Sequence, residues 1–65
     1  MSNIGKNIKK HREKIGISQD RLSKLADISA NTVAKLELDA SPNPTIETLQ
    51  KIAKALKVKV DDLIK

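Results

Sequence analysis

The segment SQDRLSKLADISANTVAKLE, Ser18 to Glu37, contains two short amphipathic helical patterns that are separated by only a few residues. Ser18 and Ser29 each stand directly before one of these patterns. Serine is a preferred N-cap because its side-chain oxygen accepts a hydrogen bond from an unpaired backbone N–H. Neither pattern is long enough to form a stable helix alone in water. The two helices must therefore be held together by the rest of the chain.

The join between the two patterns, ADIS at residues 26–29, contains no glycine or proline. Asp27 occupies the position where a residue with positive φ is expected, and aspartate tolerates the left-handed region better than most residues. Two short helices joined by three or four residues match the helix-turn-helix motif. In that motif the first helix crosses the DNA backbone and the second lies in the major groove.

Three further helical patterns flank this segment. The first runs from Asn3 to Ile15 and is followed by Gly16, which suits a left-handed helix end. Thr45 is the expected N-cap of the pattern IETLQKIAKALK at residues 46–57, and a last short turn runs from Val60 to Lys65. The expected inward-facing residues are Ile4, Ile8, Ile15, Leu22, Leu25, Ala26, Val33, Leu36, Ile46, Leu49, Ile52, Ala53 and Leu56, and the last turn carries Leu63 and Ile64.

The composition limits the chemistry that the chain can perform. Its 65 residues predict one domain over residues 1–65, with the two-helix unit at about 18–37. With no cysteine and a single histidine, His11, no cysteine–histidine metal cluster is expected. No Ser-His-Asp arrangement, glycine-rich phosphate loop or pair of carboxylates in a cleft is recognisable. We therefore expect no enzyme, no metal, no cofactor and no small-molecule substrate.

The charge favours a polyanionic partner. Thirteen Lys and Arg residues against eight Asp and Glu residues give a net charge of +5. Nucleic acid, an anionic membrane and an acidic protein all fit such a balance. The first residues have no apolar run of signal-peptide length, and no segment approaches the roughly 20 apolar residues of a membrane span. We expect a soluble cytoplasmic protein, and the apolar stripes are needed in the core rather than on a membrane.

Three segments in order resemble the DNA-binding domain of phage Cro/C1-type repressors, also called the XRE-type helix-turn-helix. They are IKKHREKIGISQDRLSKLA, ISANTVAKLE and PTIETLQKIAKALKVKVDDLI, and together they cover nearly the whole chain. The resemblance implies an all-α, five-helix Cro/C1 repressor-like domain whose recognition helix spans about residues 29–37. It also implies sequence-specific binding to double-stranded DNA by a small transcription regulator, here expected to be a repressor.

The family resemblance assigns roles to residues outside the base-reading face. It implies that Gln19 bonds both a DNA phosphate and the recognition helix, and that Ser29 or Thr32 donates a hydroxyl to a phosphate. It also implies a mostly buried structural ion pair between Arg12 and Glu37. Without the resemblance, Gln19 would be an ordinary exposed residue at a helix start.

The outer face of the recognition helix contains the base-reading candidates Ala30, Asn31 and Lys35. Asparagine can pair with adenine N6 and N7, lysine can donate to guanine O6 and N7, and an alanine methyl can meet a thymine methyl. The same residues would also suit a solvated helix face, and the resemblance is what favours base contact.

One recognition helix touches too few base pairs to select a site, so we expect a two-fold homodimer on half-sites about one helical turn apart. The candidate contacts are Val58, Val60, Leu63 and Ile64, although these residues could equally close the core. Many family members have Lys or Arg after the recognition helix, whereas this chain has the loop LDASPNPT, which contains the acidic Asp39 and no Arg. That departure keeps an alternative open: a protein-interaction module, such as an antitoxin or bridging domain, with weak or partner-dependent DNA binding.

Overall fold

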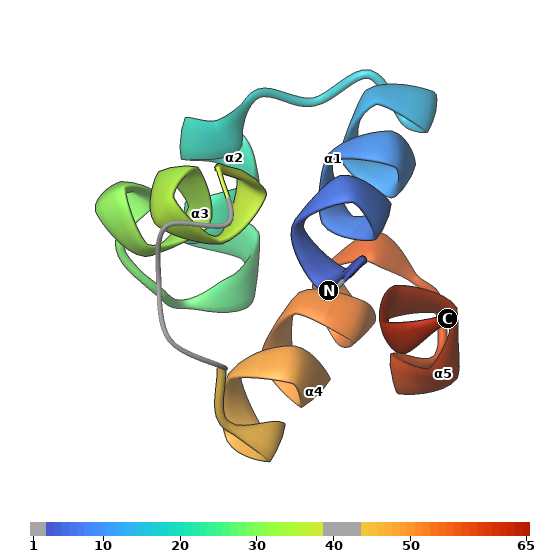
Figure 1. Ribbon diagram of the computed structural model, residues 1–65. Helices are drawn as coiled ribbons and strands as arrows, with labels where there is room; N and C mark the ends of the chain where they lie inside the picture. The colour runs from blue at the N-terminus through green and yellow to red at the C-terminus, as the bar shows by residue number, and fades with distance from the viewer. Residues whose placement is uncertain (1–2, 39–43) are drawn as a thin grey trace.

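A computed structural model describes residues 3–38 and 44–65, and this part of the chain contains five α-helices and no strand. Figure 1 shows α2 and α3 packed together on one side, α1 and α5 on the other, and α4 below them. The all-α prediction and its five helices are confirmed. None of these helices combines the length and the apolar character that crossing a membrane requires. The helices are α1 (Ile4–Lys14), α2 (Gln19–Ala26), α3 (Ala30–Glu37), α4 (Ile46–Leu56) and α5 (Val60–Ile64).

The helix starts follow from local side-chain chemistry. The three expected N-caps are confirmed, and each hydroxyl oxygen accepts a hydrogen bond from the backbone N–H three residues later. Such a bond satisfies one of the amides that a helix start leaves unpaired. The donors and acceptors are Arg21 N to Ser18 Oγ at 3.0 Å, Thr32 N to Ser29 Oγ at 3.1 Å, and Thr48 N to Thr45 Oγ1 at 3.1 Å.

Left-handed residues end two helices and follow a third. The expected positive φ angles are confirmed at Gly16, with φ 73°, and at Asp27, with φ 57°. Lys57, with φ 60°, ends α4 in the same way and was not expected. After both α2 and α4, the next N–H bonds a carbonyl five residues back: Ile28 N to Ser23 O and Val58 N to Ala53 O, both at 2.9 Å. These bonds satisfy the last carbonyls of the helix and hold a non-glycine residue in this region.

The core is aliphatic, but three residues expected to face inward are exposed. Ile15, Leu25 and Ile46 keep 50%, 49% and 64% of their surface in solvent. Ile15 follows the last residue of α1 and Ile46 is the first of α4, so both lie at helix ends, while Leu25 lies at the edge of the α2 stripe. The buried apolar residues are Ile8, Leu22, Ala26, Val33, Leu36, Leu49, Ile52, Ala53, Leu56 and Leu63.

Helix α1 approaches the end of α3 closely at Gly5. This glycine is buried, and a Cβ atom added to it would collide with the backbone carbonyl oxygen of Leu36. Glycine is normally a less favourable helix residue than alanine. Here the missing side chain permits the contact between the two helices, so the backbone of α1 packs directly on that of α3.

An ion pair joins the same two helices. Arg12 of α1 donates Nε to Glu37 Oε2 at 2.6 Å and Nη2 to Glu37 Oε1 at 3.0 Å. This is a bidentate contact with the last residue of α3. The side chains of Arg12 and Glu37 are only 11% and 3% exposed. Arg12 also donates Nη1 to Ile17 O at 2.8 Å. The guanidinium therefore also binds the segment that connects α1 to α2.

The pair changes the protonation equilibria of both groups. Burial by itself raises the pKa of Glu37, but the hydrogen bonds from Arg12 and Gln19 and the charge of Arg12 outweigh it and leave the pKa below its ordinary value. The hydrogen bond to Glu37 raises the pKa of Arg12 further above neutrality. Both side chains are therefore charged at neutral pH.

Replacing Gly5 by alanine should destabilise the chain, although alanine is the better helix former. The added Cβ has to push Leu36 O away, and overpacking of this kind costs about 1–3 kcal/mol. Unfolding in urea measures the effect, with Lys6→Ala on the exposed face of α1 as the matched control. A gain in stability from Gly5→Ala would show that α1 and α3 are further apart than described.

Replacing Glu37 by glutamine should lower the free energy of unfolding by about 3 kcal/mol, because it leaves the buried Arg12 charge without a counter-charge. The control is Glu47→Gln, since the side chain of Glu47 is 79% exposed and lies 3.7 Å from Lys51. Losing such an exposed pair costs less than about 1 kcal/mol. Equal stabilities of the two variants in urea unfolding would refute the buried pair.

The same comparison has a pH dependence of known sign. Because the pKa of Glu37 is lower in the folded than in the unfolded chain, its stabilising charge is fully effective above the ordinary value of 4.5. The stabilisation is lost as the pH falls through the folded value. The stability difference between wild type and Glu37→Gln should therefore shrink on acidification from about pH 6 to about pH 3. A constant difference would contradict the pairing.

Candidate nucleic-acid interface

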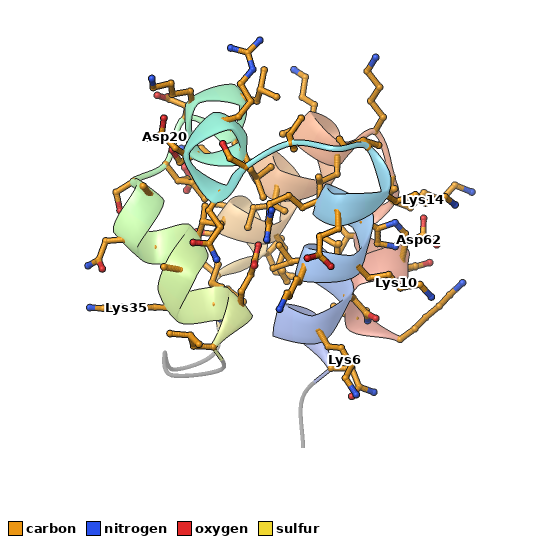
Figure 2. All side chains as sticks on the ribbon, turned by 90° about the horizontal axis from the view of Figure 1, so that it is seen from above. Lys6, Lys10, Lys14, Asp20, Lys35 and Asp62 are labelled. Carbon is orange, nitrogen blue, oxygen red and sulfur yellow. The ribbon has the colours of Figure 1, made fainter. Side chains whose placement is uncertain are left out.

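Burial of one side of α3 determines which residues its other side exposes. Val33 and Leu36 are 0% and 5% exposed and hold the helix against the core. The base-reading candidates Ala30, Asn31 and Lys35 are all exposed. In Figure 2, Lys35 points outward from α3, on the side of the molecule opposite to the labelled lysines of α1. The three candidates are thus brought together on one free surface.

Ser29 and Thr32 form one hydroxyl pair at the start of α3. Their side-chain oxygens lie 2.7 Å apart, and Ser29 Oγ also accepts the Thr32 backbone N–H. Each hydroxyl has one hydrogen, and the bond between them uses one of the two. The pair therefore keeps a single hydroxyl hydrogen that can be donated to an anion while the cap remains intact.

Gln19 is the first residue of α2, and its side chain reaches the end of α3. Its Nε2 donates to Glu37 Oε1 at 3.0 Å, and the residue is half-buried. An amide nitrogen has two hydrogens, so the second remains available to an acceptor such as a phosphate oxygen. The contact with Glu37 orients this amide. The neighbouring Asp20 carboxylate pairs with Lys24 at 3.3 Å on the surface of α2.

Glu37 is the meeting point of three helices. It accepts hydrogen bonds from Arg12 of α1 and Gln19 of α2, while it ends α3. Within the described residues, no buried side-chain nitrogen or oxygen lacks a partner. Sequence reasoning did not find the further bond from Arg12 to Ile17 O, because a carbonyl acceptor carries no residue-type signal.

The four dimer candidates differ in the surface that they offer. Leu63 is 0% exposed and belongs to the core of the chain itself, so its side chain offers no surface to a second copy. This corrects its inclusion among the candidate contacts. Val58 and Val60 are half-buried against the same core, whereas Ile64 is 51% exposed. Asn7 holds the end of α5 by donating Nδ2 to Leu63 O at 3.0 Å and to Lys65 O at 3.1 Å.

Two further residues singled out in the sequence are Asp39 and His11. Asp39 and its neighbours at residues 39–43 lie outside the described residues. His11 is half-buried on α1, and among residues 3–38 and 44–65 no three His, Cys, Asp or Glu side chains gather as a metal site would need.

Known proteins resemble this chain over most of its length. The sequence model of the helix-turn-helix family matches residues 8–63. The HTH-type transcriptional regulators SinR of Bacillus subtilis (strain 168) and of Bacillus licheniformis are each 31% identical over 61 residues, which is 94% of this chain and 55% of each relative. The chain thus spans about half the length of the curated relatives that it matches.

The family match covers both helices of the motif, the join with its left-handed Asp27, all of α4 and most of α1 and α5. The five-helix architecture agrees with this match. The chain therefore belongs to the helix-turn-helix family of the Cro/C1 (XRE) type.

Proposed function

We propose that the chain binds double-stranded DNA in a sequence-specific manner and regulates transcription in the cytoplasm. The observation that carries this proposal is the free outer face of α3, which exposes Ala30, Asn31 and Lys35. The opposite face of the same helix is anchored by Val33, Leu36 and the Glu37 hydrogen bonds. A rigidly held helix with exposed hydrogen-bonding side chains is what readout in the major groove requires.

The dimensions of α3 support this role. The major groove is about 12 Å wide and an α-helix with its side chains is about 10–12 Å across, so the helix fits. Asn31 and Lys35 are four residues apart, which corresponds to about 6 Å along the helix axis. Base pairs follow one another at about 3.4 Å. The two side chains therefore reach different base pairs, with Asn31 suited to adenine and Lys35 to guanine.

The polar groups beside α3 supply phosphate contacts. The second amide hydrogen of Gln19 and the one free hydroxyl hydrogen of the Ser29–Thr32 pair lie at the starts of α2 and α3. Helix starts carry a partial positive charge and unpaired N–H groups, and both favour a phosphate. Such contacts orient a protein on DNA without reading its sequence.

We further propose that the chain acts as a homodimeric repressor. A single short recognition helix reads too few base pairs for a selective site, whereas a two-fold dimer doubles the readout. Ile64 with Val58 and Val60 offers the apolar surface for this contact. Repression requires only that the dimer occupy a promoter, while activation would need a further productive contact. The similar proteins are named transcriptional regulators, which agrees with a regulatory role.

Site selection from random duplexes tests the readout. Wild type should enrich a two-fold sequence, while Asn31→Ala and Lys35→Ala should each relax one base position per half-site. Each loss of discrimination should be about 1–3 kcal/mol, the usual value of a good base contact. Both side chains are exposed, so neither change should affect folding. The matched control is Lys24→Ala, which removes an exposed lysine of α2 and should leave the base preference unchanged.

Repeating the selection at two salt concentrations separates base readout from charge. Binding driven by contacts to phosphates weakens steeply as the salt concentration rises, and it shows no sequence preference at any salt concentration. If wild type enriches no sequence at either concentration, the proposal fails and the protein-interaction alternative replaces it.

Ile64→Ser should weaken the dimer without unfolding the chain, because about half of this side chain is already in solvent. Affinity for a duplex with two half-sites should fall about tenfold or more, while affinity for a single half-site stays constant. Gel-shift titration measures both, with the equally exposed Ile15→Ser as the control. Equal behaviour of the two variants would exclude α5 as the dimer contact.

A further inference from the structure

A groove of about 430 Å³ lies between α2 and α4, and it uses none of the residues proposed to contact DNA. Its apolar part is formed by Leu25, Ala26 and Ala55. The small side chains of the two alanines leave the hollow open. Its polar edge is formed by Asp27 and by three lysines of the α4 region: Lys51, Lys54 and Lys57.

Leu25 is the unusual residue of this surface. It belongs to the amphipathic α2 and follows the apolar spacing of that helix, yet 49% of its surface is exposed. Single exposed leucines are common and carry no meaning alone. This one borders a concave surface next to two alanines, so a side chain that enters the groove removes apolar surface from water on both partners.

Among residues 3–38 and 44–65, the lysines at the edge lack strong ion-pair partners. Lys51 lies 3.7 Å from Glu47, whose side chain is 79% exposed, so that pair is weak. Among the described residues, no ion pair joins Lys54 or Lys57 to a carboxylate. Asp27 is the single carboxylate among the described residues that line the groove. The surface therefore presents an excess of positive charge around an apolar floor.

We propose that this groove docks an acidic segment of a partner protein. An apolar side chain of the segment packs on Leu25, Ala26 and Ala55, while its carboxylates meet Lys54 and Lys57. A nucleic acid backbone would satisfy the lysines but has no apolar side chain to cover Leu25. A neutral apolar segment would cover Leu25 but would remove lysine charges from water without a counter-charge. Of these three partners, only an acidic segment with an apolar side chain matches both parts of the groove.

The proposal is independent of DNA binding. The groove is built from the end of α2, Asp27 and the later part of α4, whereas the proposed DNA contacts lie on α3 and at the starts of α2 and α3. A failure of sequence-specific DNA binding would therefore leave the docking surface untouched, and the reverse also holds.

The test titrates the ¹⁵N-labelled full chain with a synthetic helical peptide of glutamate and alanine that carries two leucines four positions apart. Amide NMR shifts should concentrate at Leu25, Ala26 and Ala55. Lys54→Gln/Lys57→Gln should weaken binding about tenfold, as expected for the loss of two exposed ion pairs. Leu25→Ala should weaken it about fivefold through the lost apolar contact.

The control Lys6→Gln/Lys14→Gln removes the same two charges from exposed positions on α1, where Figure 2 shows both side chains pointing into solvent. It should weaken binding less than about threefold, an effect of net charge alone. Two control peptides, one with leucine changed to alanine and one with glutamate changed to glutamine, should both bind at least about fivefold more weakly.

Several outcomes would overturn the proposal. Equal losses in the two double variants would show that net charge attracts the peptide without the groove. Unchanged binding by either control peptide would show that the apolar or the acidic part is irrelevant. Shifts centred outside α2 and α4 would place the contact elsewhere. A random-sequence DNA duplex that shifts the groove amides more than the peptide does would assign the groove to nucleic acid.

Discussion

The arrangement of the first three helices depends on the hydrogen bonds that converge on the carboxylate of Glu37. Glu37 is the last residue of α3, and its carboxylate accepts two hydrogen bonds from Arg12 of α1 and one from Gln19 of α2. A charge in a side chain that is 3% exposed is tolerated only when it is paired and hydrogen-bonded, and this one is both. Because directional bonds from two helices converge on one group, they restrict the angle of α3 more tightly than apolar contacts alone.

Backbone packing complements this polar contact. Gly5 lets α1 approach the carbonyl of Leu36, one residue before Glu37, so the close contact and the ion pair lie at the same end of α3. The start of α3 is held instead by the left-handed turn at Asp27 and the cap at Ser29. A helix held at both ends presents its outer face in one orientation, and both base readout and the proposed half-site geometry require this.

The prediction of the core failed at one residue on the margin of the apolar stripes of α1, α2 and α4: Ile15, Leu25 and Ile46. Helical periodicity identifies the stripe, and Leu22, Val33 and Leu49 are buried as it predicts. It cannot tell how far a neighbouring helix extends over the stripe. That is why Ile46 is exposed at the start of α4 and Leu25 borders the groove. The same limit applies to the last turn, where Leu63 is buried and the adjacent Ile64 is half-exposed.

The sequence by itself determined the helices, their serine and threonine caps, the left-handed Asp27 and the chemical types on the face of α3. These features depend on interactions among residues a few positions apart, so they can be predicted from a short stretch of sequence. The resemblance to the family added the Arg12–Glu37 pair. Only the tertiary structure decided that α1 passes α3 at a glycine, that Asn7 binds the Leu63 carbonyl of α5, and that α2 and α4 leave a basic groove. Each of these joins residues far apart in the chain, and their contact depends on how all five helices pack together.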